Sequence, residues 1–189
     1  MSMSYPRRGD TLVEVTVSFA IFAVVAVSVS VLMNRGLAIG QQSLEIALVR
    51  EQISSQAEML RFARYNTADT SVWKDAINAD DRLVNGEVAS KKLDNCANTP
   101  PNTAFVLHPV GDGEQIAVRG FDATSYVSPE VSSLVEEDGT AHGLWVQVAN
   151  AEDQSSSGLE SYDFYIHACW YVPSSDQPQT LTTMVRLYG

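Results

Sequence analysis

The sequence predicts an α+β fold, in which a long N-terminal α-helix packs on an antiparallel β-sheet head. Three observations support this prediction. The run from Val15 to Met33 is 19 residues long and contains no charge, Gly or Pro. Residues 41–64 then repeat apolar side chains at steps of three and four, as an amphipathic helix does. From Ala104 onward the apolar residues alternate with a period of two, which is typical of strands.

The apolar run has the length of a membrane-spanning helix. At 1.5 Å per residue it extends roughly 28 Å, close to the thickness of a bilayer's hydrocarbon core. Eleven of its residues are Val, Ile, Leu or Phe, and together they favour insertion by about 3 to 6 kcal/mol. Thr16, Ser18, Ser28 and Ser30 offset part of that free energy. We therefore expect residues 12–33 to enter a membrane.

The amphipathic stretch continues this helix. We predict one helix from about Thr11 to about Arg64, roughly 80 Å long, with its weakest join between Asn34 and Gly40. Gly36 and Gly40 each cost about 1 kcal/mol relative to Ala in a helix. The first half then needs lipid or partner helices, and the second half needs a sheet. The apolar stripe expected to face that sheet consists of Ile46, Val49, Ile53, Ala57 and Leu60.

The region between helix and strands has weaker signals. Residues 71–79 are expected to form a short helix capped by Thr70 or Ser71. Asn85-Gly86 is a turn signal, and we expect a turn there.

Alternation predicts five strands, and residues 122–141 are expected to be loop-rich. In the fourth strand, the even-numbered residues from Tyr162 to Val172 are expected to pack on the helix, so that Cys169 faces away from it. Polar linkers between the last three strands suit antiparallel neighbours. The expected strands are 104–108, 114–121, 143–150, 162–172 and 180–188.

Charge and cysteine usage restrict the partners and the compartment. The formal net charge of −11 and the sequence pI near 4.5 argue against a nucleic acid as direct partner, since such surfaces are normally basic. The chain has two cysteines, Cys96 and Cys169, with no zinc-ligand spacing. On an exported chain they suggest one disulfide, and two buried free thiols are the alternative.

No catalytic motif is present in the sequence, so we expect neither an enzyme nor a cofactor. G-x-S-x-G, P-loop, H-E-x-x-H and G-x-G-x-x-G patterns are all missing. His108 and His167 are expected to be ordinary strand residues rather than metal ligands. The acidic stretches 112–114 and 136–138 could offer oxygen ligands to Ca²⁺, but they lack EF-hand spacing and are expected to be solvated turns.

The residues before the apolar run carry a more specific signal. Arg7, Arg8 and Gly9 precede Asp10, and one acid, Glu14, stands at the edge of the run. A carboxylate in a membrane segment is costly and marks a functional site by default. This pattern resembles the class III signal of type IV pilins and pseudopilins. The resemblance is specific over residues 7–33 and only architectural beyond them.

The resemblance implies a processing site and an assembly site. A prepilin peptidase would cut between Gly9 and Asp10, and Glu14 would be the fifth mature residue. Arg7 and Arg8 would form the basic part of the leader. The family usually has Phe as its first mature residue where this chain has Asp10, which leaves N-methylation of the new terminus open.

The same resemblance implies the domains, partners and location of the chain. Residues 1–9 would be the leader, 10–64 the long helix and 65–189 an extracellular head. The chain would be a single-pass protein of the cytoplasmic membrane, then a subunit of a surface pilus or pseudopilus. Its partners would be other pilins in a homo- or hetero-polymer, the prepilin peptidase and the pilus assembly machinery.

Two other interpretations of the N-terminus stay open on the sequence. A signal-anchored extracellular binding or adhesion protein that never polymerises would also have an apolar helix and an exported head. A secretory signal peptide cut after Gly40 would release a soluble adhesin-like domain, although its apolar region is normally only about 7 to 15 residues long.

Overall fold

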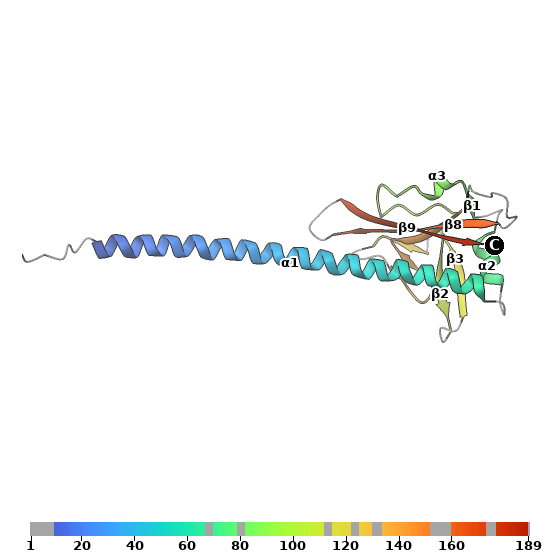
Figure 1. Ribbon diagram of the computed structural model, residues 1–189, viewed down its shortest axis with the longest axis horizontal. Coiled ribbons are helices and arrows are strands. Elements are labelled where there is room, and N and C mark those ends of the chain that lie inside the picture. Colours follow the sequence, from blue (N-terminus) through green and yellow to red (C-terminus); the bar gives the residue numbers. More distant parts are fainter. Residues whose placement is uncertain are drawn as a thin grey trace, which may run out of the picture. The chain divides into compact units, whose positions relative to one another are not determined.

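The structure is a computed structural model, and Figure 1 shows its helices and strands. The expected leader, with Arg7, Arg8 and Gly9, lies outside the described residues. The chain divides into two compact units, Met1–Ser43 and Leu44–Gly189, and each is described by itself. The structure describes residues 10–66, 70–78, 82–111, 115–121, 125–129, 134–151, 160–172 and 177–188.

Helix α1 runs from Asp10 to Tyr65, close to the predicted bounds. The helix continues through Gly36 and Gly40, so the structure does not show the predicted loosening there. In the first unit every described side chain from Thr11 to Ser43 is exposed.

The part of α1 in the second unit packs on a β-sheet through the predicted stripe. Val49, Ile53, Ala57 and Leu60 are buried in one cluster with side chains of the sheet, and Ile46 packs at its edge. This confirms the helix-on-sheet prediction.

A polar contact at the same interface links α1 to strand β2 (Phe105–Val110). Gln56 is 1% exposed, its Nε2 donates to the carbonyl of Leu107 at 2.7 Å, and its Oε1 accepts from the Leu107 amide at 2.9 Å. The side-chain amide of Gln56 therefore makes the pair of hydrogen bonds to the Leu107 backbone that a neighbouring strand would make.

The main sheet has six strands, in the order β3-β2-β7-β8-β9, with β1 pairing beside β7. All pairs are antiparallel except β1 with β7, which is parallel. The predicted α+β fold with an antiparallel head is confirmed. The strands other than β2 are β1 (Leu83–Val84), β3 (Gln115–Gly120), β7 (Leu144–Asn150), β8 (Ser161–Tyr171) and β9 (Pro178–Tyr188).

Strand β8 divides the head into two cores, as its alternation predicts. Its even-numbered residues from Tyr162 to Trp170 join the cluster that contains the α1 stripe. On the other face, Cys169 lies in a second cluster that includes Trp145 and Cys96.

Cys96 and Cys169 form a disulfide, which confirms the predicted bridge. It closes a loop with a sequence separation of 73 residues, for which chain entropy gives a stabilisation of about 4 kcal/mol. The Tyr126 hydroxyl also donates to the carbonyl of Cys96 at 2.8 Å.

Three local expectations need correction. Residues expected to be loop-rich form a small sheet of β4 (Tyr126–Val127), β5 (Leu134–Val135) and β6 (Ala141–His142). Asn85-Gly86 is not a turn: the Asn85 side chain accepts from the Glu87 amide at 2.7 Å and caps α3 (Gly86–Ala89). Thr70 precedes α2 (Ser71–Ala76), but its side chain makes no cap hydrogen bond.

Gly143, between β6 and β7, stands where no larger residue fits. Its φ is +65°, and a Cβ there would lie 2.1 Å from the carbonyl oxygen of Cys169 and 2.6 Å from Cγ of Pro129. The carbonyl of Gly143 also accepts from the Cys169 amide at 2.7 Å. The backbone at Gly143 can lie this close to Cys169 only because glycine has no side chain.

We predict that Gly143→Ala lowers the free energy of unfolding by about 3 kcal/mol or more, since the left-handed backbone and a clash with main chain both act against it. Gly111→Ala is the matched control, because Gly111 has φ +63° but no atom within 4 Å of its Cβ position. It should lose only about 1 to 2 kcal/mol. Chemical denaturation followed by tryptophan fluorescence measures both, and equal losses would contradict the steric argument.

His167 on β8 is a buried neutral imidazole. Its Nε2 lies 2.7 Å from the carbonyl of Ala89, to which it donates, and its Nδ1 lies 3.1 Å from the Thr182 hydroxyl, from which it accepts. The ring stacks on Trp145 with centroids 4.9 Å apart. Burial lowers the pKa of His167 from 6.5 to about 4, with Lys92 lowering it further and the Ala89 carbonyl opposing the shift.

We predict that the head loses stability as the pH falls from about 6.5 to about 4. The unfolded chain binds a proton at His167 in that range and the folded chain does not. The stability that neutral His167 contributes to the fold is therefore fully present only above the pKa of the unfolded chain. The shift corresponds to about 3 kcal/mol. Unfolding free energies measured across this range should therefore fall more for the parent chain than for His167→Gln. The same dependence of the unfolding free energy on pH in both proteins would show that His167 does not cause the loss of stability.

Candidate functional site

Glu14 is the acid that interrupts the apolar surface of α1. It lies one turn after Asp10, where the helix begins, and it is exposed. Among the described residues no hydrogen bond or ion pair engages its carboxylate. The first two turns of the helix thus contain two acidic residues, Asp10 and Glu14, close to the positive end of the helix dipole.

The hydroxyl groups further along the run bond within the helix. Thr16 donates to the carbonyl of Val13 at 2.9 Å and Ser28 donates to that of Val24 at 2.7 Å. Ser30 does the same with Ala26 at 2.9 Å. Because these donors are already bonded, the run can enter an apolar environment without leaving them unpaired.

Ser18 differs from these residues and extends the polar character of Glu14. Glu14 and Ser18 are four residues apart, so they share one face of the helix. Both line a shallow crevice with Val15, Phe19 and Phe22. From the sequence, Ser18 was expected only to offset insertion and to be small, although its i, i+4 spacing from Glu14 was the signal for this pair.

Ion pairing is the chemistry that this arrangement supports. A charged side chain at the centre of a membrane helix costs about 2.5 to 3.5 kcal/mol, and less near its ends. A cation placed beside Glu14 would offset that cost, and the Ser18 hydroxyl could donate a further hydrogen bond. Besides the Glu14 carboxylate and the Ser18 hydroxyl, the described lining of the crevice is apolar.

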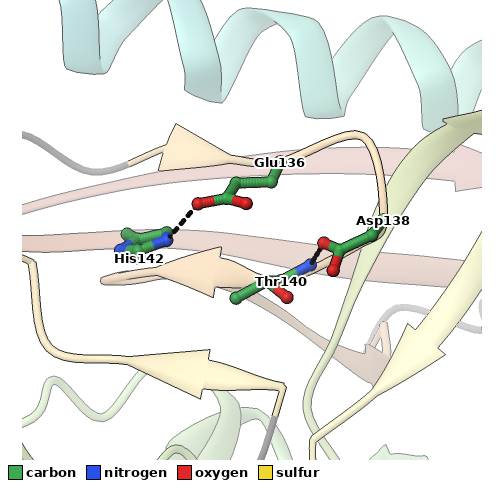
Figure 2. Close-up of polar contacts among 4 residues, drawn as sticks. All are labelled: Glu136, Asp138, Thr140 and His142. Atoms are coloured by element: carbon green, nitrogen blue, oxygen red, sulfur yellow. Dashed lines mark hydrogen bonds and ion pairs between the residues drawn. The ribbon is translucent and has the colours of Figure 1, made fainter.

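The acidic turn that could have offered oxygen ligands to Ca²⁺ is used internally (Figure 2). Glu136 pairs with Nε2 of His142 at 2.8 Å, and Asp138 accepts from the Thr140 amide at 2.8 Å. The hydrogen bonds from Thr140 lower the pKa of the Asp138 carboxyl. Together these contacts close the hairpin between β5 and β6. The other acidic stretch, 112–114, lies outside the described residues.

Backbone carbonyls hold this hairpin to the main sheet. Nδ1 of His108 lies 3.0 Å from the carbonyl oxygen of Glu137, and Arg119 donates to the carbonyl of Asp138. Within the described part of the chain, no three His, Cys, Asp or Glu side chains gather where they could hold a metal ion. His108 and His167 both lie in strands, on β2 and β8, and contact backbone carbonyls.

The predicted site residues fall in separate places. Asp10 begins α1 with Glu14 one turn later, and Cys96 and Cys169 meet in the head. Among the described residues, one helix is long and apolar enough to cross a membrane, between Thr11 and Tyr65. Comparison with known proteins gave no matching family model, no matching curated protein and no matching solved structure. The resemblance in residues 7–33 therefore remains a sequence argument.

Proposed function

We propose that the chain is a structural subunit, major or minor, of a type IV pilus or a related pseudopilus. One observation carries the proposal: an exposed apolar helix begins at Asp10, directly after Arg7-Arg8-Gly9, and has Glu14 in its second turn. A core helix of a soluble protein would be buried, and a simple anchor has no need of the acid.

Processing creates the partner that Glu14 lacks. Hydrolysis of the Gly9–Asp10 bond by a prepilin peptidase would release an ammonium group at Asp10 while leaving the helix attached to the head. Removal of the leader also takes away Arg7 and Arg8, so the net charge changes from −11 to −13, with 10 basic against 23 acidic residues.

Assembly would then move α1 from lipid into an array of like helices. In that array Glu14 pairs with the terminal ammonium of a neighbouring subunit. A buried charge left without its partner costs about 3 to 5 kcal/mol, so the pair selects one register of neighbouring helices. The carboxylate of Asp10 adds a second acid near the same ammonium.

Small side chains would allow the helices to approach closely. Without water between helices, association depends on packing and on interhelical hydrogen bonds. The small residues that we expect at these contacts are Ser18, Ala20, Ala23, Ala26, Ser28 and Ser30.

The head would face the outside of the cell. Its disulfide suits an oxidising compartment. Its acidic charge argues against direct binding of nucleic acid. We propose a structural role with no enzymatic activity and no cofactor.

We predict that Glu14→Ala and Glu14→Gln both reduce incorporation into filaments about 100-fold or more, because each leaves the neighbour's ammonium without its partner. Membrane insertion should be unchanged, since removing a charge favours the bilayer. Sheared filaments and membrane fractions from cells that assemble the filament, compared by immunoblot, measure both quantities.

Glu51→Ala is the matched control, because Glu51 is an exposed glutamate on the same helix in the second unit. It should assemble like the parent chain. Normal assembly of both Glu14 variants would contradict the proposal and favour the signal-anchored protein that never polymerises.

A further inference from the structure

Among the described strands, β9 is a long edge strand that pairs only with β8. It runs for 11 residues, from Pro178 to Tyr188, and pairs over that whole length with β8. An open edge presents unpaired amide and carbonyl groups to any extended chain.

Several features that usually protect such an edge are missing from β9. It contains no lysine, its one proline is the first residue, its pairing with β8 shows no bulge, and its one charged residue, Arg186, is paired with Asp163 of β8. At the opposite edge of the sheet, α2 packs against β3. On β9, the side chain of Arg64 donates to the backbone carbonyl of Tyr188, at the end of the strand.

A groove of about 520 Å³ lies between this strand and α1. Arg50, Ser54 and Arg61 form its helical wall, and they recur along one side of the helix over three turns. This wall is roughly 16 Å long, which is the length of about five residues of extended chain. The groove therefore suits a short strand.

The floor and rim of the groove define what would fit. Buried Ile53, Ala57 and Val185 provide an apolar floor, and Met184, 48% exposed, stands at the rim. A strand added to β9 places alternate side chains over such a floor and turns the others away. Apolar residues at every second position would match it.

The charge of the groove favours an acidic occupant. Glu58 is paired with Arg61 at 2.5 Å. Arg50 has no hydrogen bond or ion pair with any described residue. The groove is therefore locally positive on a chain whose net charge is −11. Complementary charge steers partners and fixes register.

We propose that α1 and β9 form a strand-addition site for an extended acidic segment of another protein, with apolar residues at alternate positions. Main-chain hydrogen bonds to β9 supply affinity, and Arg50 with the apolar floor supplies selectivity. The site lies wholly within the second unit and does not depend on polymerisation, so its test is separate from that of the filament.

The experiment uses the full chain in detergent micelles and a fluorescein-labelled nine-residue peptide that alternates Val with Asp. Fluorescence anisotropy should show saturable binding, weakened at least tenfold by Ser54→Trp, which fills the groove, and by Arg50→Glu. Ser55→Trp is the matched control, since Ser55 is exposed on the next position of the helix and does not line the groove. It should leave binding unchanged.

Two N-methylated peptides test the strand geometry. Methyl groups on one alternating set of amides would face β9 and abolish binding, and the other set would face away and preserve it. The proposal is overturned if no saturable binding occurs up to about 1 mM, if both methylated peptides bind equally, or if a Val-Lys peptide binds as well as the Val-Asp peptide. A loss with Ser55→Trp equal to that with Ser54→Trp would also overturn it.

Discussion

The first half of α1 cannot remove its apolar surface from water by itself, and the account of this chain depends on that constraint. Its side chains from Thr11 to Ser43 are all exposed in the described structure, including 11 Val, Ile, Leu or Phe residues between Val15 and Met33. Burying such surface contributes about 25 cal/mol per Å². In the proposed function, lipid and then neighbouring helices cover it. The hydroxyl groups bonded within the helix suit either environment, and a cation beside Glu14 would offset the cost of moving its charge out of water.

The head, in contrast to the first half of α1, buries its apolar side chains within its own structure. One face of the sheet packs on the stripe of α1 from Val49 to Leu60, and the other face encloses the disulfide. The two hydrogen bonds of Gln56 to Leu107 tie the helix to β2 at the first of these interfaces. A buried amide with both groups bonded stabilises one register, since a slip of the helix would leave both groups unpaired. The head therefore does not need the apolar first half of the helix to complete its core.

Local periodicity in the sequence was enough to predict the stripe of α1 and the two faces of β8, whereas the pairing of Cys96 with Cys169 was expected from the two cysteines of a chain thought to be exported. Periodicity could not predict β1 or the small sheet of β4, β5 and β6, because strands of two residues carry no alternation and depend on distant partners. The charge of Glu14 made it recognisable in the sequence. The groove beside β9 could not be predicted from the sequence, because its lining comes from residues more than 100 positions apart. The cap formed by Asn85 was mistaken for a turn because both use the same residue type.

In the proposed pilus subunit, Glu14 acquires its partner only if the chain is cut before Asp10, so the N-terminus of the mature protein decides between the proposal and its alternatives. Mass spectrometry of the purified mature protein, with mapping of its N-terminal peptide, tests this directly. The account predicts that the chain starts at Asp10 and retains the whole apolar helix, with or without a methyl group on the new amine. A chain that starts at an intact Met1, or one that starts near Gln41 after loss of the helix, would contradict it.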